Sequence, residues 1–238
     1  MAVGTSSLFG SARKGVSYRF SGGRWSAGPT SAFDLFAVSC ATANFCGAVD
    51  NLKPHGHGYL YNGKSWSAPT TIGGGYADAI SCPTTTFCAV LLRPLGSTLE
   101  SKVVYYRDGR WSKAVLIDPS GSLASVSCAS ANFCVAVDEN GNAVTDINGK
   151  WSRPVAVSSG ASLGGVSCPT RTFCMAVSPD GSAASYNGSR WSSFTISAHV
   201  DFTSVSCPTT SFCAAAGETS PFSNGTPTVY VAIYRSSS

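Results

Sequence analysis

The ten cysteines of this 238-residue chain fall into five copies of one phrase, and each copy holds two cysteines separated by five residues. The first cysteines of successive copies are 39 to 46 residues apart. A period near ~40 residues is typical of repeat proteins, whose units stack side by side. The sequence therefore predicts one assembly of similar units. The cysteine pairs are Cys40/Cys46, Cys82/Cys88, Cys128/Cys134, Cys168/Cys174 and Cys207/Cys213.

Each cysteine pair is expected to form a disulfide inside its own copy. The rival interpretation is metal binding, but structural zinc sites need four ligands and favour closer cysteines. The three histidines of the chain cannot complete five such sites, so we predict no metal and no cofactor. Five disulfides indicate an oxidising compartment and a secreted, extracellular protein. The first residues lack the basic and apolar segments of a signal peptide, and any export signal is expected to have been removed.

The copy from Val166 to Trp191 shows what one unit is expected to build. Residues 166–168 and 173–177 form a disulfide-linked hairpin, residues 183–186 form a third strand, and Trp191 opens a fourth. The turn before the tryptophan is Asn187-Gly188, a dipeptide that favours tight hairpins because both residues accept positive φ. We assign one turn position to Gly22-Gly23, Asn62-Gly63, Asp108-Gly109 and Asn148-Gly149, and the same strand start to Trp25, Trp66, Trp111 and Trp151.

Four antiparallel strands in every ~40 residues predict an all-β fold, a β-propeller of four-stranded blades. Charged residues make up 12% of the chain and hydrophobic residues 43%, as in globular proteins. The pattern SCPTxxFCxAV…YNGxxWS resembles the Cys-rich propeller repeats of secreted bacterial surface proteins. The resemblance spans nearly the whole chain and implies an architecture without a particular activity. Residues 63–66 also resemble the Asp-box turn of sialidase-type propellers, but Tyr61 stands at the Asp position, which implies turn geometry and not sialidase chemistry.

Six blades are favoured over five. The segment before the first cysteine pair has a weak, cysteine-free copy of the repeat, with residues 8–12, 16–20 and Gly22-Gly23 matching strands and a turn. The last copy ends after its third strand without a tryptophan. The alternative is five blades, with the Trp25 strand completing the last one. We expect a single domain over residues 1–238, with repeat units at about 1–30, 31–72, 73–118, 119–158, 159–198 and 199–238.

Charged residues are expected to separate onto two faces. Blade strands run up and down, so the first-to-second and third-to-fourth turns share a lower face, and the remaining loops share an upper one. Ten of the twelve carboxylates fall on upper segments, whereas basic residues precede the repeat tryptophans on the lower side. Lysine and arginine on exposed outer strands discourage edge-to-edge aggregation. Because they are spread round a rim and not gathered in a groove, nucleic-acid binding is not expected.

Candidate ligand-binding residues lie on the upper face. Three upper loops vary most, at residues 51–57, 93–102 and 218–226, and loops on a rigid scaffold often carry function. His55 and His57 in the first loop could ligate a metal, although histidines in such a loop are usually solvated. The candidate residues are Asp34, Asp50, Tyr76, Asp78, Asp138, Asp180, Asp201 and Glu218.

Two sets of recurring residues have structural explanations. The repeat tryptophans could stack on sugars, but their regular placement favours packing between blades. A serine precedes the first cysteine of every copy, at 39, 81, 127, 167 and 206, which suggests a hydrogen-bonded ring. Five equivalent serines argue against a nucleophile, because catalysis needs a unique residue with a base beside it.

The leading hypothesis is a secreted, non-catalytic, lectin-like protein that recognises carbohydrate or another cell-surface component through repeated upper-face sites. No nucleic-acid partner and no membrane insertion are expected. One alternative is an extracellular glycoside hydrolase or lyase that uses two upper-face carboxylates from Asp34, Asp78, Asp138 and Asp201. Another is a protein-interaction or structural propeller.

Overall fold

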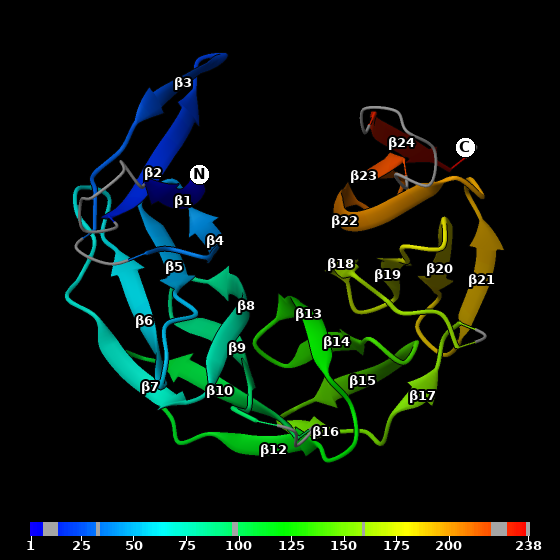
Figure 1. The fold of residues 1–238 in the computed structure, drawn as a ribbon, viewed down its shortest axis with the longest axis horizontal. Coiled ribbons are helices and arrows are strands. Elements are labelled where there is room, and N and C mark those ends of the chain that lie inside the picture. Colours follow the sequence, from blue (N-terminus) through cyan, green and yellow to red (C-terminus); the bar gives the residue numbers. More distant parts are fainter. Residues whose placement is uncertain (7–13, 32–33, 97–99, 159, 220–227, 237–238) are drawn as a thin grey trace. The chain divides into compact units, whose positions relative to one another are not determined.

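The computed structural model of this chain describes residues 1–6, 14–31, 34–96, 100–158, 160–219 and 228–236. Two compact units divide the chain, Met1–Ser120 and Gly121–Ser238. The described residues form six antiparallel sheets, three in each unit (Figure 1). These sheets are the blades of a six-bladed, all-β propeller, which confirms the predicted fold class. The assignment of residues 1–238 to a single domain stays a prediction.

The first unit holds blades one to three. Blade one contains β1 (Ala2–Ser6), β2 (Lys14–Ser21) and β3 (Arg24–Ala27). Blade two contains β4 (Ala37–Thr42), β5 (Phe45–Val49), β6 (His55–Tyr61) and β7 (Thr70–Gly74). Blade three contains β8 (Tyr76–Thr84), β9 (Phe87–Arg93), β10 (Ser101–Arg107), β11 (Arg110–Trp111) and β12 (Val115–Asp118).

The second unit holds blades four to six. Blade four contains β13 (Leu123–Ser130), β14 (Phe133–Asp138), β15 (Asn142–Ile147), β16 (Lys150–Trp151) and β17 (Val155–Ala156). Blade five contains β18 (Gly165–Thr170), β19 (Phe173–Val177), β20 (Ser182–Tyr186) and β21 (Trp191–Thr195). Blade six contains β22 (Val200–Thr209), β23 (Phe212–Thr219) and β24 (Val229–Arg235).

All five disulfides join the two strands of a single hairpin, as the sequence predicts. Across the five pairs the Cα–Cα distances are 3.9 to 4.1 Å, and no cysteine is free. In blades two and four, the bonded cysteines are direct cross-strand partners, Cys40 with Cys46 and Cys128 with Cys134. The register of these two hairpins therefore brings the thiols together.

In the other three blades, the bonded cysteines lie where the hairpin ladder is interrupted. The ladder of blade three shifts register between Ser81 and Thr84, and the Cys82–Cys88 disulfide spans this irregularity. A proline follows the first cysteine in these three blades, and proline cannot donate a ladder hydrogen bond. Cys88 is fully buried in the core that blades two and three share, so this disulfide is also part of the packing. The corresponding disulfides of blades five and six are Cys168–Cys174 and Cys207–Cys213.

The second strand of each cysteine-containing blade lies inside its sheet, and in blades two to five it is mostly buried. In β14 all six residues are buried, although its sequence FCVAVD shows no alternation of apolar and polar residues. A strand that is covered on both faces needs apolar side chains on both, which explains the continuous apolar run. Core clusters join β5 to β9, β14 to β19 and β19 to β23, so each blade packs on the next within its unit.

The repeated serines form hydrogen bonds between blades. Each of these serines directly precedes the first cysteine of its own blade. Its Oγ accepts a hydrogen bond from the backbone N–H of the first cysteine of the next blade, at 2.9 Å. The three described pairs are Ser39–Cys82, Ser127–Cys168 and Ser167–Cys207. The predicted structural role of these serines is confirmed at these three positions.

Three repeat tryptophans, Trp66, Trp111 and Trp191, pack their own blade on the preceding one. The Trp66 Nε1 donates to Ser17 Oγ in blade one at 3.4 Å. A Cβ atom on Gly58 of blade two would lie 2.6 Å from the Trp111 ring, so glycine is required at this contact. Trp191 packs on the core that blade five shares with blade four. These contacts support the packing interpretation of the tryptophans over sugar stacking.

The turns before the tryptophans occupy two positions, not the single position that we predicted. Asp108 and Asn148 have positive φ, and their glycines stand two residues before the tryptophan. In Asn62-Gly63 and Asn187-Gly188 the glycine stands three residues before it. There the asparagine Oδ1 accepts the N–H groups of two following residues, which closes the turn through its side chain. The spacing from glycine to tryptophan distinguishes the two forms.

In the described residues, the first and last blades each have three strands. In blade one, β3 pairs with β2 and places Trp25 opposite Phe20, so the Trp25 strand belongs to this blade and does not complete blade six. The predicted strand at residues 8–12 lies outside the described residues. In blade six, β24 occupies the third-strand position, and the described part of that blade has no fourth strand.

Candidate functional site

The two sets of loops separate within each blade as the sequence predicts. At one end of blade three, the Asp108 N–H donates to the Thr86 carbonyl and links its two turns at 3.0 Å. At the other end of blade two, the Gly75 N–H donates to the carbonyl of Pro54 in the upper loop at 3.1 Å. The upper end of blade two therefore carries the variable loop at residues 51–57, which begins beside Asp50, and the link to Tyr76.

Asp50 is fully buried at the base of the first upper loop. Its carboxylate accepts from the Tyr59 hydroxyl at 2.6 Å and from the His57 backbone N–H at 3.0 Å, and it lies 3.0 Å from His57 Nδ1. Burial, and then the neighbouring Asp50 and Asp34 carboxylates, raise the pKa of the Tyr59 hydroxyl. This network holds the loop to β6, so the Asp50 carboxylate is engaged inside the protein.

Asp138 has the same role in blade four. One of its oxygens accepts the backbone N–H groups of Asn140 and Asn142 at 2.9 and 2.7 Å, and the other accepts the Asn142 side-chain amide. Asp34 is also buried. Of the predicted binding residues, Asp50 and Asp138 are therefore turned to the interior and brace their own loops.

Tyr76 lies on the upper side of the first unit between two basic side chains. Lys53 Nζ and Arg93 Cζ each lie 5.4 Å from its ring centre. Arg93 also donates through Nε to Asp78 Oδ2 at 2.6 Å. Cations against an aromatic ring are held by its quadrupole. The ring that we predicted would stack on a ligand therefore packs on neighbouring side chains of its own unit.

The other predicted residues in the second unit lie at the surface. Asp201 and Glu218 are opposite each other on β22 and β23. Asp180 is exposed in the loop between β19 and β20. Its partial burial raises the pKa of the carboxyl, but hydrogen bonds from Ser182 and Ser178 outweigh burial, and the net pKa is lowered. The rest of the upper loop at 220–226 lies outside the described residues.

Four of the eight predicted residues lie in the first unit and four in the second, and their role in ligand binding stays a prediction. The four carboxylates proposed for a hydrolase, Asp34, Asp78, Asp138 and Asp201, belong to blades two, three, four and six by sequence position. Within the described ranges, no group of three histidine, cysteine or acidic side chains is placed to hold a metal ion. No helix in these ranges is long and apolar enough to cross a membrane.

A more definite site lies in blade six, whose described residues form three strands. In other blades the last aromatic residue of the third strand contacts the repeat tryptophan, with ring centres 5.2 to 5.3 Å apart. The pairs are Phe20–Trp25, Tyr61–Trp66, Tyr106–Trp111 and Tyr186–Trp191. Tyr234 is the equivalent residue of blade six, because it faces Cys213 as Tyr186 faces Cys174. No tryptophan follows Tyr234 in the chain.

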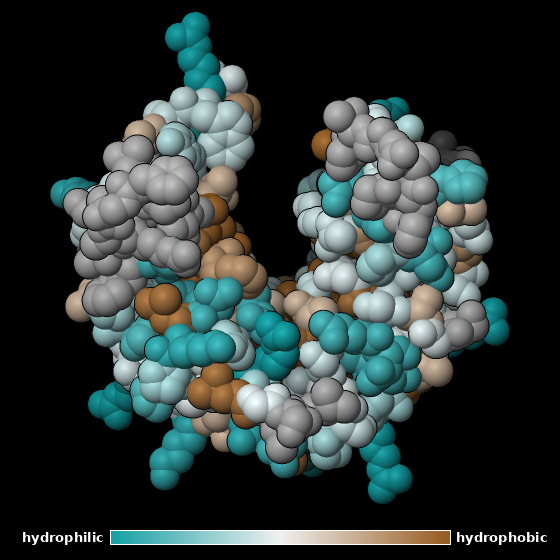
Figure 2. All heavy atoms as spheres, in the orientation of Figure 1, coloured by the Kyte–Doolittle hydropathy of each residue, from teal (hydrophilic) through white to brown (hydrophobic). Residues whose placement is uncertain are grey.

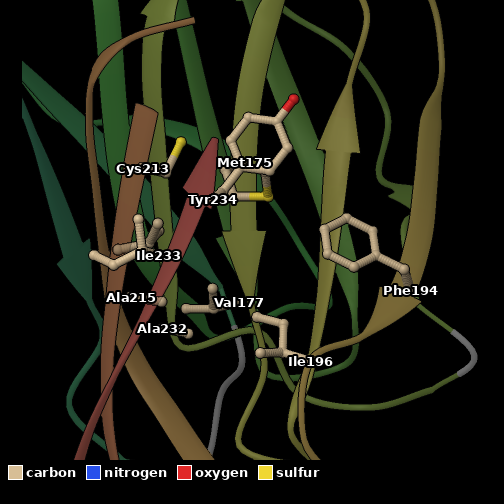
Figure 3. A pocket seen from close by; sticks show the side chains of 10 residues that line it. Met175, Val177, Phe194, Ile196, Cys213, Ala215, Ala232, Ile233 and Tyr234 are labelled. Carbon is tan, nitrogen blue, oxygen red and sulfur yellow. The ribbon is translucent and has the colours of Figure 1, made fainter. Parts of the chain in front are cut away.

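A pocket of about 190 Å³ lies beside Tyr234, between blades five and six of the second unit. Figure 3 shows Met175 and Val177 of β19 at its centre, with Phe194 on one side and Ala232 and Tyr234 on the other. All ten lining residues are hydrophobic. By contrast, the face drawn in Figure 2 is mainly hydrophilic, with small hydrophobic patches. We call this pocket the tryptophan socket, since it lies beside Tyr234, the counterpart of the aromatic residues that contact the repeat tryptophans.

The edge of β24 beside the socket is free in the described part of the second unit. One side of β24 pairs with β23 along seven residues (Figure 1). The side chains of Val229, Val231 and Ile233 are 75%, 63% and 50% exposed. An apolar edge strand with unpaired backbone groups is a template for pairing with another chain. The socket and this edge form one continuous candidate binding site.

Sequence reasoning noted that the last repeat ends without a tryptophan but derived no site from it. The signal was available, because four of the five other copies have an aromatic residue five positions before the tryptophan. What the sequence does not contain is the contact of Trp66, Trp111 and Trp191 with the preceding blade of their unit, which shows where the pocket beside Tyr234 lies.

No protein-family model matches the chain, and a comparison with curated proteins finds no sequence match. The fold of this chain is similar to that of several solved structures. YCF48 bound to D1 peptide has a TM-score of 0.64 at 12% identity, over 87% of this chain and 69% of that one. YCF48 from Cyanidioschyzon merolae has a TM-score of 0.64 at 13% identity, over 85% and 71%. The WD40 beta propeller domain of Doa1 has a TM-score of 0.58 at 10% identity, over 77% and 62%.

The fold is a β-propeller. At these identities the likeness shows the fold alone. The five disulfides suggest that this propeller is found in an oxidising environment, where disulfides persist.

Proposed function

We propose that this protein is a non-catalytic binding protein that takes up an extended segment of another polypeptide at the tryptophan socket and the edge of β24. The observation that carries the proposal is an apolar pocket beside a strand edge that is unpaired in the described residues. When a peptide adds to a sheet edge, its main chain supplies affinity and the adjoining pockets select its side chains. Both parts of that arrangement are present in blade six.

The chemistry of the pocket favours a polypeptide over a sugar. Its lining contains no charged side chain and no amide side chain. Sites for small polar ligands need placed polar groups that fix the orientation of the ligand. The solved structure of YCF48 bound to D1 peptide is a precedent for a peptide on this fold. We further propose that the protein acts outside the cytoplasm, since its disulfides suit an oxidising compartment.

Lectin-like recognition of carbohydrate through the upper face is the alternative with less support. Asp50 and Asp138 bond within their own loops, and Tyr76 packs on Lys53 and Arg93. Asp78 is paired with Arg93, which leaves Asp180, Asp201 and Glu218 as surface carboxylates of the predicted set. These three residues are the ones to test for a sugar site.

The experiment is a selection of a displayed random peptide library on the oxidised full chain, with a glycan array in parallel. We expect apolar peptides to be enriched and the array to stay blank. The Ala232→Phe variant fills the socket and is expected to weaken the selected peptides by about tenfold or more. Val231→Phe, whose side chain lies one position away on the same strand and does not line the socket, is the control. Glycan binding without peptide enrichment, or equal peptide binding by both variants, would overturn the proposal.

A further inference from the structure

We infer that the lower end of the first unit binds a flexible polymer with repeated phosphate or sulfate groups, and that Arg107 and Arg110 of blade three are its main contacts. The lower end is the end of each blade that holds the turn between the third and fourth strands. All residues of this site belong to the unit Met1–Ser120. The inference concerns a surface other than blade six and does not depend on the proposed function.

The positive charge of the chain belongs to the first unit. Residues 1–120 contain 11 lysine and arginine residues and 6 acidic residues, which gives a net charge of +5 with neutral histidines. Residues 121–238 contain 5 basic and 6 acidic residues, which gives a net charge of −1. Away from the lower end of the first unit, Arg93 and Lys102 pair with carboxylates. These pairs neutralise part of the charge there.

Exposed cations gather at the lower end of this unit, in or beside the turns between third and fourth strands. They are Arg24, Lys64, Arg107, Arg110 and Lys113. Among the residues that the structure describes, no salt bridge joins any of these five side chains to a carboxylate. Uncompensated charges of one sign produce a field that attracts ligands of the opposite sign. The lower end of the first unit is therefore suited to an anionic partner.

Arg107 and Arg110 face each other across the hairpin of β10 and β11, and both residues are exposed. We call these two side chains the arginine fork. Like charges directly opposite on an antiparallel pair destabilise it, because their Cβ atoms lie only about 5 Å apart. An anion between the two guanidinium groups would remove this repulsion and accept hydrogen bonds from both. The arrangement costs stability in the free protein and becomes favourable when an anion is bound.

The guanidinium of Arg107 is held against two aromatic rings of its own blade. Its Cζ lies 4.9 Å from the ring centre of Phe87 and 4.7 Å from that of Tyr105, and both aromatic residues are buried. A stacked guanidinium keeps its hydrogen-bond donors in a fixed plane, so less conformational entropy is lost on binding. These donors match the paired oxygens of a phosphate or sulfate group. One half of the fork is therefore preorganised for an oxyanion.

Protection of an exposed sheet edge does not explain the fork. Lysine and arginine on edge strands discourage aggregation, and this explanation fits isolated cations on outer strands. Arg107, however, lies on β10, which pairs with β9 on one side and with β11 and β12 on the other. Charge on an edge also does not require two arginines directly opposite each other. The position of Arg107 inside the sheet favours binding over edge protection.

The spread of the cations over three blades favours a flexible polymer. Arg24 belongs to blade one, Lys64 to the turn of blade two, and the arginine fork to blade three. A chain with repeated anionic groups can contact several of these cations at once, and each additional contact strengthens the binding of the whole chain. Because the cations follow a rim and are not gathered in a groove, a rigid duplex fits them less well.

The test measures binding of end-labelled inorganic polyphosphate and end-labelled heparin to the oxidised full chain by fluorescence anisotropy, over a series of salt concentrations. Arg107→Gln/Arg110→Gln is expected to weaken binding by about tenfold or more, because charge-assisted hydrogen bonds are lost. The slope of log affinity against log salt concentration should fall by about two. The tighter polymer shows whether phosphate or sulfate is preferred, and absence of binding to both would overturn the inference.

Arg171→Gln/Arg190→Gln is the matched control for the double variant. It removes the same charge from two exposed residues at the lower turns of blade five, in the second unit. We expect it to weaken binding by less than about threefold, because salt screens distant exposed charges. Both double variants should keep five disulfides and a wild-type circular dichroism spectrum. Equal losses in the two would show that net charge, and not the arginine fork, binds the polymer.

A conservative substitution separates the stacked guanidinium from a simple point charge. Arg107→Lys keeps the charge but loses the planar donors, and it is expected to weaken binding by about threefold or more. Arg24→Lys makes the same change at an exposed arginine of blade one and is expected to change binding by less than about twofold. Wild-type affinity in Arg107→Lys would contradict the role of the stacked guanidinium.

Competition with two further anions identifies the chemistry that the site selects. Inorganic phosphate and polyglutamate, at the same concentration of anionic groups, are expected to displace the labelled polymers about tenfold less well than unlabelled polyphosphate or heparin. Equal displacement by inorganic phosphate would show a site for a free ion and not for a polymer. Equal displacement by polyglutamate would show that the site does not distinguish phosphate or sulfate from carboxylate. Either result would overturn the inference.

Discussion

The backbone N–H of Cys168 donates to Ser127 Oγ at 2.9 Å, and this bond ties the disulfide hairpin of blade five to that of blade four. Both residues lie on first strands, β13 and β18, which are 41 residues apart in sequence. The same bond joins Ser167 to Cys207 one blade later. One repeated Ser-Cys dipeptide thus supplies the disulfide of its own blade and the hydrogen-bond acceptor for the next.

Ser127→Ala is expected to destabilise the protein by about 1–2 kcal/mol, because the Cys168 N–H would lose its acceptor in a partly buried position. The free energy of unfolding in guanidinium chloride measures the effect. Ser193→Ala, at an exposed position on β21, is the control and should change stability by less than about 0.5 kcal/mol. Equal effects of the two substitutions would show that the bond between blades contributes nothing.

Trp191→Ala is expected to cost about 3 kcal/mol, because this side chain packs on the core shared by blades four and five. Trp25→Ala should cost less than about 1 kcal/mol, since the Trp25 side chain is 58% exposed. Thermal unfolding of both variants gives the comparison. If Trp25→Ala were the more damaging change, the bridging role of the tryptophans would be wrong.

The hydroxyl of Tyr59 should not ionise while the protein is folded, because burial and then Asp50 raise its pKa. A raised pKa in the folded state adds stability that is complete below the unfolded value of about 10 and is lost as the pH rises above it. We expect the free energy of unfolding to fall between pH 10 and 11, and to fall less steeply in Tyr59→Phe. Parallel curves for the two proteins would exclude Tyr59 as the source.

The Cys128–Cys134 disulfide closes a short loop in a buried hairpin. Replacing both cysteines with alanine is expected to lower the free energy of unfolding by about 2 kcal/mol, as loop-closure entropy predicts for seven residues. The double variant should still fold, because β13 and β14 keep their ladder and core contacts. Chemical denaturation measures the change, and loss of folding would mean that the disulfide is required and not only stabilising.

The fold was largely predictable because each repeat contains local sequence signals for its hairpin and its turns. Cysteine spacing predicted the five hairpins, and glycine-containing turns predicted the strand ends. The interrupted ladder at Cys82–Cys88 was not predicted, although the proline after Cys82 is visible in the sequence. The sequence analysis placed Asn62-Gly63 and Asp108-Gly109 at one turn position because the dipeptides are alike. Gly63 stands three residues before its tryptophan and Gly109 two, and this difference in spacing distinguishes the two turns.

The site was less predictable, because the position of a residue on a loop does not show whether its side chain is buried. Asp50 and Asp138 lie on upper loops as expected, yet backbone N–H groups and nearby side chains hold their carboxylates inside. The socket depends on packing between blades five and six, which no single repeat encodes. The pocket is recognised only when the tryptophan contacts of the other copies are known.

Residue-resolved amide hydrogen exchange on β24 tests the central claim most directly, because it reports whether the edge that defines the site is free. The account predicts that the Ile233 amide exchanges on the order of a hundredfold faster than the neighbouring Tyr234 amide, which bonds within the sheet. An Ile233 amide as slow as Tyr234 in the free protein would show that a strand already covers this edge, and would contradict the account.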